Sequence, residues 1–250
     1  MIRDGALTEW QHLDMPYIYQ SIHTLSHKTR HAADHLKILN TAAMRLFGVQ
    51  SDLTRRELER QTTALLEANY CTRNTSIEVI LKLYPTGEQT LEVGQESIYS
   101  GYVVRSLRPE ASIIRSTAPL ADYPTSAMVA TRHLMREIAT ARDKHRVIMA
   151  NEQGDVINDV AEPLLVIKED TLTLQPSPLQ SVEQQLIELA ALRLGYKVEH
   201  APITVKMLQS AHEVLILSWQ GITAVSHIES KPYMSVISER LALEIESKEK

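Results

Sequence analysis

The 250-residue sequence has little cysteine, no long apolar run and no cluster of basic residues, and each absence excludes a class of protein. The single cysteine, Cys71, cannot form an internal disulfide, so a reducing cytoplasm is the expected compartment. No stretch approaches the roughly 20 apolar residues that a membrane helix requires, so we expect no membrane partner. The chain begins with acidic side chains such as Asp4 and Glu9 instead of an apolar segment, which argues against a signal peptide.

The charge balance also argues against a nucleic-acid partner. The chain has 26 Lys and Arg residues against 31 Asp and Glu residues, a net charge of −5, and no basic stripe. Nucleic-acid binding requires clustered cations that displace phosphate counterions. The composition, 44% hydrophobic and 23% charged, is that of a globular protein, and the length allows one large domain or two unequal ones.

The first 118 residues are predicted to form a small α+β domain. Alternating apolar residues predict strands, and apolar residues at helical spacing that stop at Gly48 predict a helix. Pro85-Thr-Gly87 predicts a turn after the second strand. The expected strands are 17–24, 77–84, 95–107 and 112–116, and the expected helices are 31–48 and 53–69.

A linker at 119–124 and a larger domain at 125–250 are expected to follow. Ser181 is predicted to cap a helix that stops at Gly195. The last ten residues, 241–250, are rich in charge and are expected to be frayed or helical. The other expected helices are 128–142 and 205–210, and the expected strands are 147–150, a pair within 156–167, 171–174, 196–203 and 213–217.

Several short phrases, taken in their order and spacing, resemble one enzyme family. They are His35-Leu36 with Leu39, Asn151-Glu-Gln-Gly154, Leu186-Ile-Glu-Leu-Ala190, Ala201-Pro-Ile-Thr204 and Ala211-His-Glu-Val214. The order resembles the class IV aminotransferases, the fold-type IV pyridoxal phosphate (PLP) enzymes. These include branched-chain and D-amino-acid aminotransferases and aminodeoxychorismate lyase. The resemblance implies an α+β, two-domain, D-amino-acid aminotransferase-like fold, with a small α+β N-terminal domain and a larger β-barrel-like/α C-terminal domain.

The resemblance also implies a cofactor site, whose amine is missing. PLP enzymes of this type need a lysine for the Schiff base, and its position in the family's pattern falls on Thr125. No lysine occurs between Lys82 and Lys144, so a small shift in alignment supplies none. A threonine hydroxyl cannot form a Schiff base.

Other groups that the family uses are replaced as well. The glutamate near the pyridine nitrogen falls on Asn158, with Asp159 as a substitute if the register slips by one. The phosphate-binding arginine falls on Ile38, which has no guanidinium. The turn that presents amides and a hydroxyl to the phosphate falls on Gln180-Ser181-Val182-Glu183, where the charge of Glu183 would repel a dianion. The family's Gly-Thr pair falls on Ser218-Trp219.

These replacements predict a degenerate class IV protein that binds no PLP. It would act as a structural or partner subunit, in a homodimer or in a heterodimer with a related subunit, or as a small-molecule-binding protein. The alternative is residual enzymology: an active PLP-dependent class IV aminotransferase or aminodeoxychorismate-lyase-like enzyme acting on amino acids, or a PLP-independent reaction in the same cleft.

Two further patterns leave alternatives open. Four histidines recur at every fourth position: His23, His27, His31 and His35. On one helix they would chelate a metal, but their spacing crosses a predicted strand-to-helix junction, so we expect solvent-facing or capping histidines and no metal site. Three arginines near the expected pocket strands are candidates for a carboxylate ligand or plain surface residues: Arg105, Arg108 and Arg115.

A hydrolase interpretation finds no support in sequence motifs. The chain has neither a G-x-S-x-G nucleophile turn nor an H-E-x-x-H zinc motif. The hydroxyls of Thr125, Ser126 and Ser181 are candidates to line the pocket with Arg132 or His133. Hydroxyls at a helix start are typical of caps, which is the interpretation we prefer.

Overall fold

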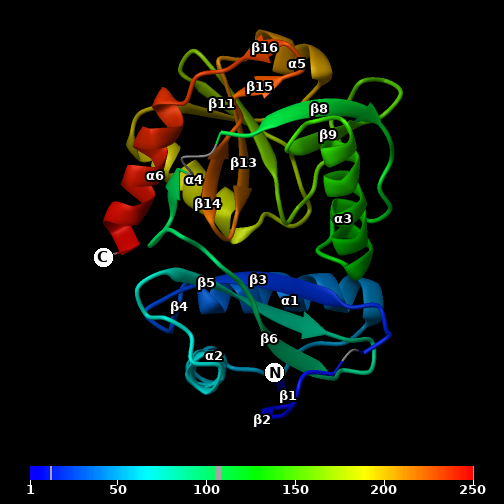
Figure 1. Ribbon diagram of the computed structural model, residues 1–250, viewed down its shortest axis with the longest axis vertical. Coiled ribbons are helices and arrows are strands. Elements are labelled where there is room, and N and C mark those ends of the chain that lie inside the picture. Colours follow the sequence, from blue (N-terminus) through cyan, green and yellow to red (C-terminus); the bar gives the residue numbers. More distant parts are fainter. Residues whose placement is uncertain (12, 105–107, 250) are drawn as a thin grey trace. The chain divides into compact units, whose positions relative to one another are not determined.

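In the computed structural model, which describes residues 1–11, 13–104 and 108–249, contacts divide the chain into two compact units (Figure 1). Unit 1 comprises Met1–Gly101 and Tyr123–Ser126, and unit 2 comprises Tyr102–Asp122 and Ala127–Lys250. The domain boundaries expected from the sequence, at 118 and 125, stay a prediction, because a division by contacts does not show which part folds independently. Within the described residues, no helix is both long and apolar enough to cross a membrane.

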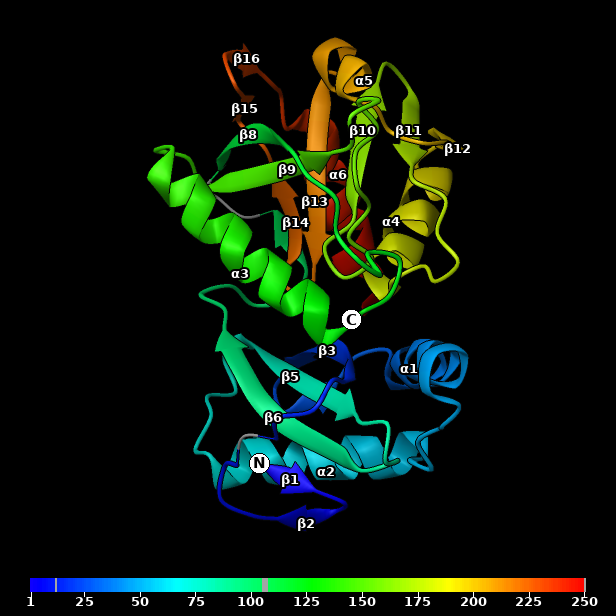
Figure 2. The same ribbon diagram turned by 90° about the vertical axis from the view of Figure 1, so that its right-hand side faces the viewer.

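Unit 1, in its described residues, is a six-stranded antiparallel sheet with two helices (Figure 2). The strand order is β2-β1-β6-β5-β3-β4. Helix α1 packs on β3, and α2 packs against β4 and β6. The elements are β1 (Ile2–Arg3), β2 (Ala6–Leu7), β3 (Ile18–Leu25), β4 (Lys28–Thr29), α1 (Ala32–Phe47), α2 (Arg55–Ala68), β5 (Ser76–Leu83) and β6 (Gln89–Glu96).

Local signals set the ends of both helices in unit 1. Helix α1 ends at Gly48, whose φ of 72° suits glycine and lets its N–H bond to the last helical turn. Helix α2 begins after Thr54, whose side chain accepts a hydrogen bond from the Glu57 N–H at 3.2 Å. Both helices match the ranges expected from the sequence.

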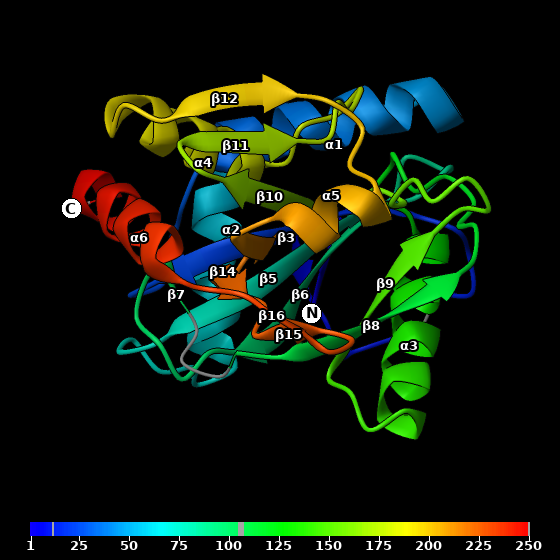
Figure 3. The ribbon, with the colours of Figure 1, turned by 90° about the horizontal axis from the view of Figure 1, so that it is seen from above.

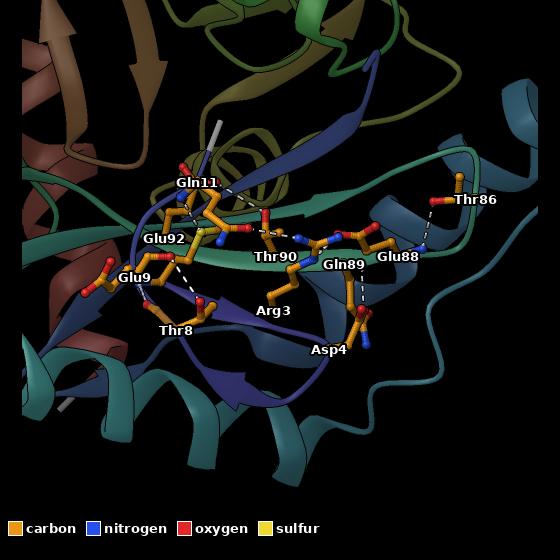
Figure 4. A network of polar contacts seen from close by, with 11 residues as sticks. Arg3, Asp4, Thr8, Glu9, Gln11, Thr86, Glu88, Gln89, Thr90 and Glu92 are labelled. Carbon is orange, nitrogen blue, oxygen red and sulfur yellow. Dashed lines mark hydrogen bonds and ion pairs between the residues drawn. The ribbon is translucent and has the colours of Figure 1, made fainter. Parts of the chain in front are cut away.

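Polar side chains tie the N-terminal strands to β6 (Figure 4). Arg3 forms an ion pair with Glu88 and donates to Gln11 Oε1 at 3.1 Å. Asp4 accepts from the Gln89 N–H at 3.0 Å. Sequence patterns do not reveal β1 and β2, because each has two residues and β1 depends on pairing with β6, far along the chain.

Unit 2 contains a six-stranded sheet, β12-β11-β10-β13-β14-β7, and a four-stranded sheet, β16-β15-β8-β9, within its described residues. Figure 3 shows α4 beside α6, and α3 beside β8 and β9. The elements are β7 (Val103–Val104), β8 (Glu110–Arg115), α3 (Ser126–Ala141), β9 (Arg146–Ala150), β10 (Leu164–Lys168), β11 (Thr171–Leu174), α4 (Val182–Arg193), β12 (Lys197–His200), α5 (Val205–Ser210), β13 (Glu213–Ser218), β14 (Gly221–Ala224), β15 (His227–Ile228), β16 (Lys231–Pro232) and α6 (Val236–Glu249).

The strand β10 is apolar at consecutive positions because both of its faces are covered. Leu165 and Ile167 belong to the core formed with α4 and α6. Leu164 and Val166 belong to a second core, which includes residues of the four-stranded sheet. Side chains alternate along a strand, so a central strand between two packed layers has no polar face.

Some predicted elements differ from the observed ones. The run 156–167 forms only β10, because Pro163 lacks the N–H that a ladder needs and the preceding segment is irregular. In the range 95–107, β6 extends only to Glu96, the two-residue β7 pairs with β14 in unit 2, and residues 105–107 lie outside the described ones. The strand expected at 112–116 exists as β8, but it pairs in parallel with β9 in unit 2 and not with the small-domain sheet.

Candidate functional site

The residues predicted to line a pocket are divided between the units. Unit 1 contains Ile38 and Thr125, and unit 2 contains Asn158, Ser181, Val182, Ser218 and Trp219. Ile38 is buried on α1 and is wholly apolar. It offers a ligand no charge and no hydrogen bond.

Thr125 is held in place at the edge of β3. It forms an isolated antiparallel bridge with Ile18, and its N–H donates to the Tyr123 carbonyl at 2.9 Å. The residue is buried and directly precedes α3. The next hydroxyl, that of Ser126, accepts a hydrogen bond from the Tyr17 N–H at 3.3 Å. Position 125 therefore has a backbone held by hydrogen bonds and a side chain without an amine.

Asn158 is buried in unit 2, and neither its Oδ1 nor its Nδ2 has a hydrogen-bond partner among the described residues. A buried amide without partners costs roughly 1–3 kcal/mol for each group left unpaired. Such an arrangement is typical of a site that awaits a ligand or water.

The neighbouring Asp159 is already engaged by a cation. Both of its carboxylate oxygens accept hydrogen bonds from Arg132 Nη1, at 2.8 and 2.7 Å. Burial raises the pKa of Asp159, and the charge of Arg132 opposes that rise. Asp159 could therefore replace the family's glutamate only by giving up its ion pair with Arg132. His133, the other residue named as a companion of the hydroxyls, is exposed on α3.

The first turn of α4 carries an unusual acid. Ser181 caps the helix, as predicted, because its Oγ accepts from the Gln184 N–H at 3.1 Å. Val182 and Glu183 follow, and both are buried. Burial raises the pKa of Glu183 to about 7, against the opposing effects of its own backbone N–H and the Ser181 hydroxyl. Glu183 Oε1 has no partner in the described part of the chain.

Two buried glutamines next to this turn were not expected from the sequence. Gln175 donates from Nε2 to the Val156 carbonyl at 2.7 Å, and Gln184 donates from Nε2 to the Gln175 carbonyl at 3.3 Å. The Oε1 atoms of both remain unpartnered among the described residues. No local pattern marks these residues, because their burial depends on how α4 packs against the end of β11.

Ser218 is the last residue of β13, and Trp219 and Gln220 form the tight turn to β14. Ser218 Oγ accepts from the Gln220 N–H at 3.3 Å, and the indole of Trp219 is buried. Gly221 closes the turn with a φ of +106°, and a Cβ there would lie 2.7 Å from the Val103 carbonyl oxygen. The turn therefore holds a large aromatic ring inside unit 2.

The predicted histidine set lies in unit 1 and serves as internal hydrogen-bonding groups. His35 donates from Nδ1 to Gln20 Oε1 at 3.0 Å, and His23 Nε2 lies 3.1 Å from Ser76 Oγ. His23, His27 and His35 are buried, so the expectation of solvent-facing residues was wrong there. Among the described residues, no three possible ligands are grouped closely enough to hold a metal ion.

The predicted arginines bind main-chain carbonyls. Arg108 donates to the Tyr233 carbonyl and Arg115 donates to the Asn151 carbonyl. Arg105 lies outside the described residues. The contacts of Arg108 and Arg115 are those of structural side chains.

The arrangement of the sheets and helices is that of the fold-type IV enzymes. The model of the family "Amino-transferase class IV" matches residues 18–228, and the chain belongs to this family. A search of curated proteins found no match.

Solved structures agree on the fold. A Legionella pneumophila protein provisionally designated 4-amino-4-deoxychorismate lyase has 16% identity and a TM-score of 0.77, over 92% of this chain and 90% of its own. The branched-chain aminotransferase of Thermoproteus uzoniensis, with norvaline, has 17% identity and a TM-score of 0.75, over 92% and 84%. A hypothetical aminotransferase from Mycobacterium tuberculosis, with alpha-ketoglutarate and PMP bound, has 14% identity and a TM-score of 0.75, over 92% and 88%.

Proposed function

We propose that this chain is a degenerate class IV aminotransferase-like protein that binds no PLP and acts as a small-molecule-binding or partner subunit. The observation that carries the proposal is the buried Thr125 directly before α3, where the family's pattern has its lysine. A hydroxyl cannot condense with the cofactor's aldehyde. The nearest earlier lysine, Lys82, pairs with Glu92 at 2.7 Å and lies over the Tyr17 ring.

The proposed loss of cofactor-binding groups extends to the residue expected beside the pyridine nitrogen of PLP. A carboxylate keeps that nitrogen protonated, whereas the neutral amide of Asn158 has no charge to do so. Asp159 has its charge matched by Arg132. The two unpartnered polar atoms of Asn158 instead suit a neutral ligand that both donates and accepts hydrogen bonds.

The residues expected at the phosphate end of PLP are poorly suited to bind a phosphate. Ile38 is apolar, and Glu183 places a partly ionised carboxyl in the first turn of α4, where a phosphate would bind. Trp219 occupies, with a buried indole, the turn that would approach the phosphate. Each of these residues favours a ligand without a dianionic group.

The alternative is an active PLP-dependent class IV aminotransferase or aminodeoxychorismate-lyase-like enzyme acting on amino acids. Family membership favours it, and so does the PMP bound to the similar Mycobacterium tuberculosis protein. It requires a lysine elsewhere in the chain to reach the cofactor, because Thr125 has no amine.

Titration of the purified protein with PLP separates these two candidates. The proposal predicts the absorbance spectrum of free PLP at every protein concentration, with none retained after gel filtration. A new visible band that survives gel filtration and disappears with borohydride would establish the alternative. Pyridoxal without phosphate is the matched control, because it reacts with surface lysines but gains nothing from a phosphate site.

We also propose that the chain works as a cytoplasmic dimer, either with itself or with a related class IV subunit. Light scattering coupled to gel filtration measures the mass, and a dimer is expected. Affinity capture from the chain's own cell extract should recover a class IV sister subunit that has the missing lysine. A monomer with no such companion would contradict the partner role.

A further inference from the structure

Unit 2 contains a cavity apart from the predicted pocket residues, between α3, β9, β10 and the segment that precedes β10. Its volume is about 80 Å³, enough for a small molecule of a few heavy atoms. Buried apolar side chains from four elements form part of its lining: Met135, Met149, Leu164 and Ile216. Cavities of this kind, apolar with a few polar groups, are where small molecules bind.

The cavity is distinct from the Asn158 site. Ile157 and Asp159 line it, whereas Asn158, between them, does not. The wall is held in place, because the Ile157 N–H donates to the Met149 carbonyl at 2.9 Å and Asp159 Oδ1 accepts from the Ala161 N–H at 3.1 Å. A ligand here would therefore not occupy the site of the proposed function.

The charged groups of the cavity leave one cation in excess. Arg132 pairs with Asp159 at 2.7 Å, and Arg146 pairs with Glu162 at 2.9 Å. The third guanidinium that lines the cavity, Arg136, is exposed and forms no ion pair with any residue of the described ranges. A single excess positive charge suits a monoanion, and two nearby carboxylates disfavour a phosphate dianion.

We propose that this cavity binds a small aliphatic monocarboxylate. The carboxylate meets the Arg136 guanidinium at the mouth, where a two-pronged hydrogen bond is available. The hydrocarbon part lies on the methionine and aliphatic lining. Both features are needed together, because an exposed arginine alone binds carboxylates weakly.

Calorimetric titration with butyrate tests the proposal, with butyramide as the neutral probe of the same shape. The wild-type protein should bind butyrate saturably and butyramide at least about tenfold more weakly, a difference of about 1.4 kcal/mol. Arg136→Gln should weaken butyrate binding about tenfold, and Arg136→Lys should weaken it less, because the charge remains.

Arg142→Gln is the matched control, since Arg142 is an exposed arginine just past the end of α3 that does not line the cavity. It should leave butyrate binding unchanged. The proposal is overturned if the folded wild-type protein shows no saturable binding, if butyramide binds as well as butyrate, or if Arg136→Gln has no more effect than Arg142→Gln. None of these outcomes depends on whether PLP binds.

Discussion

Each unit buries an ionisable side chain whose pKa is strongly shifted, a histidine in unit 1 and a glutamate in unit 2. Unit 1 buries His35, whose pKa is lowered to about 3 by desolvation, with smaller effects from His31 and His23. Unit 2 buries Glu183, whose pKa is raised to about 7 by desolvation. In both cases burial disfavours the charged form. The same physical cause therefore makes the stability of the two units depend on pH in opposite directions.

The direction follows from comparing folded and unfolded states. The neutral form of His35 is favoured on folding, so its contribution is present above the unfolded pKa of 6.5 and is lost as pH falls below it. The protonated form of Glu183 is favoured on folding, so its contribution is present below 4.5 and is lost as pH rises through about 7. Unit 1 should therefore lose stability as pH falls from 6.5 towards 3, and unit 2 should lose stability as pH rises from 4.5 to about 7.

The largest expected effect comes from the buried ion pair of unit 2. Arg132→Met leaves Asp159 without its cation, and the free energy of unfolding at neutral pH should fall by roughly 3–5 kcal/mol. Urea denaturation measures the change. The double variant Arg132→Met/Asp159→Leu should recover most of the loss, because no buried charge remains. A single-variant loss below about 1 kcal/mol would show that the pair is not desolvated.

Glu183→Gln should remove the loss of stability that unit 2 undergoes as pH rises from 4.5 to about 7. Between pH 5 and 8 the wild-type protein should lose roughly 2–3 kcal/mol through this residue, whereas the variant should not. Hydrogen exchange of the α4 amides, followed over that range, measures the local stability. Glu239→Gln, which changes an exposed acid in the first turn of α6, is the matched control. Equal pH slopes for Glu183→Gln and the wild type would contradict the raised pKa.

His35→Gln should make a smaller change, in acid and in unit 1. Between pH 7 and 5 the wild-type protein should lose roughly 2 kcal/mol through His35, and the variant should lose less. Exchange of the α1 amides reports this loss, while the α4 amides should not follow it. If amide exchange in α1 and α4 changed equally in His35→Gln and in Glu183→Gln, the opposite pH dependence of the two units would be contradicted.

The sequence predicted most of the fold because its signals are local. Gly48, Thr54 and Ser181 mark helix ends by conformation or by capping, and the structure places helix boundaries at each. Prediction failed where pairing is distant: β8 was assigned to the small domain, but its partner β9 lies about 35 residues later in unit 2.

The candidate site was less predictable than the fold. The family's pattern pointed to Asn158, but it could not show that both amide atoms lack partners among the described residues. Glu183 was expected to be a charged residue at a helix start, and only its burial reveals a pKa near neutrality. Gln175 and Gln184 carry no local signal, since they are polar residues buried by tertiary packing alone.

The most direct test of the central claim is the intact mass of the protein after incubation with PLP and reduction with borohydride. The absence of an amine at Thr125 predicts an unchanged mass, apart from sparse labelling that pyridoxal reproduces equally. A stoichiometric gain of one phosphopyridoxyl group, mapped to a single lysine and absent with pyridoxal, would contradict the claim and show that this chain retains the chemistry of its family.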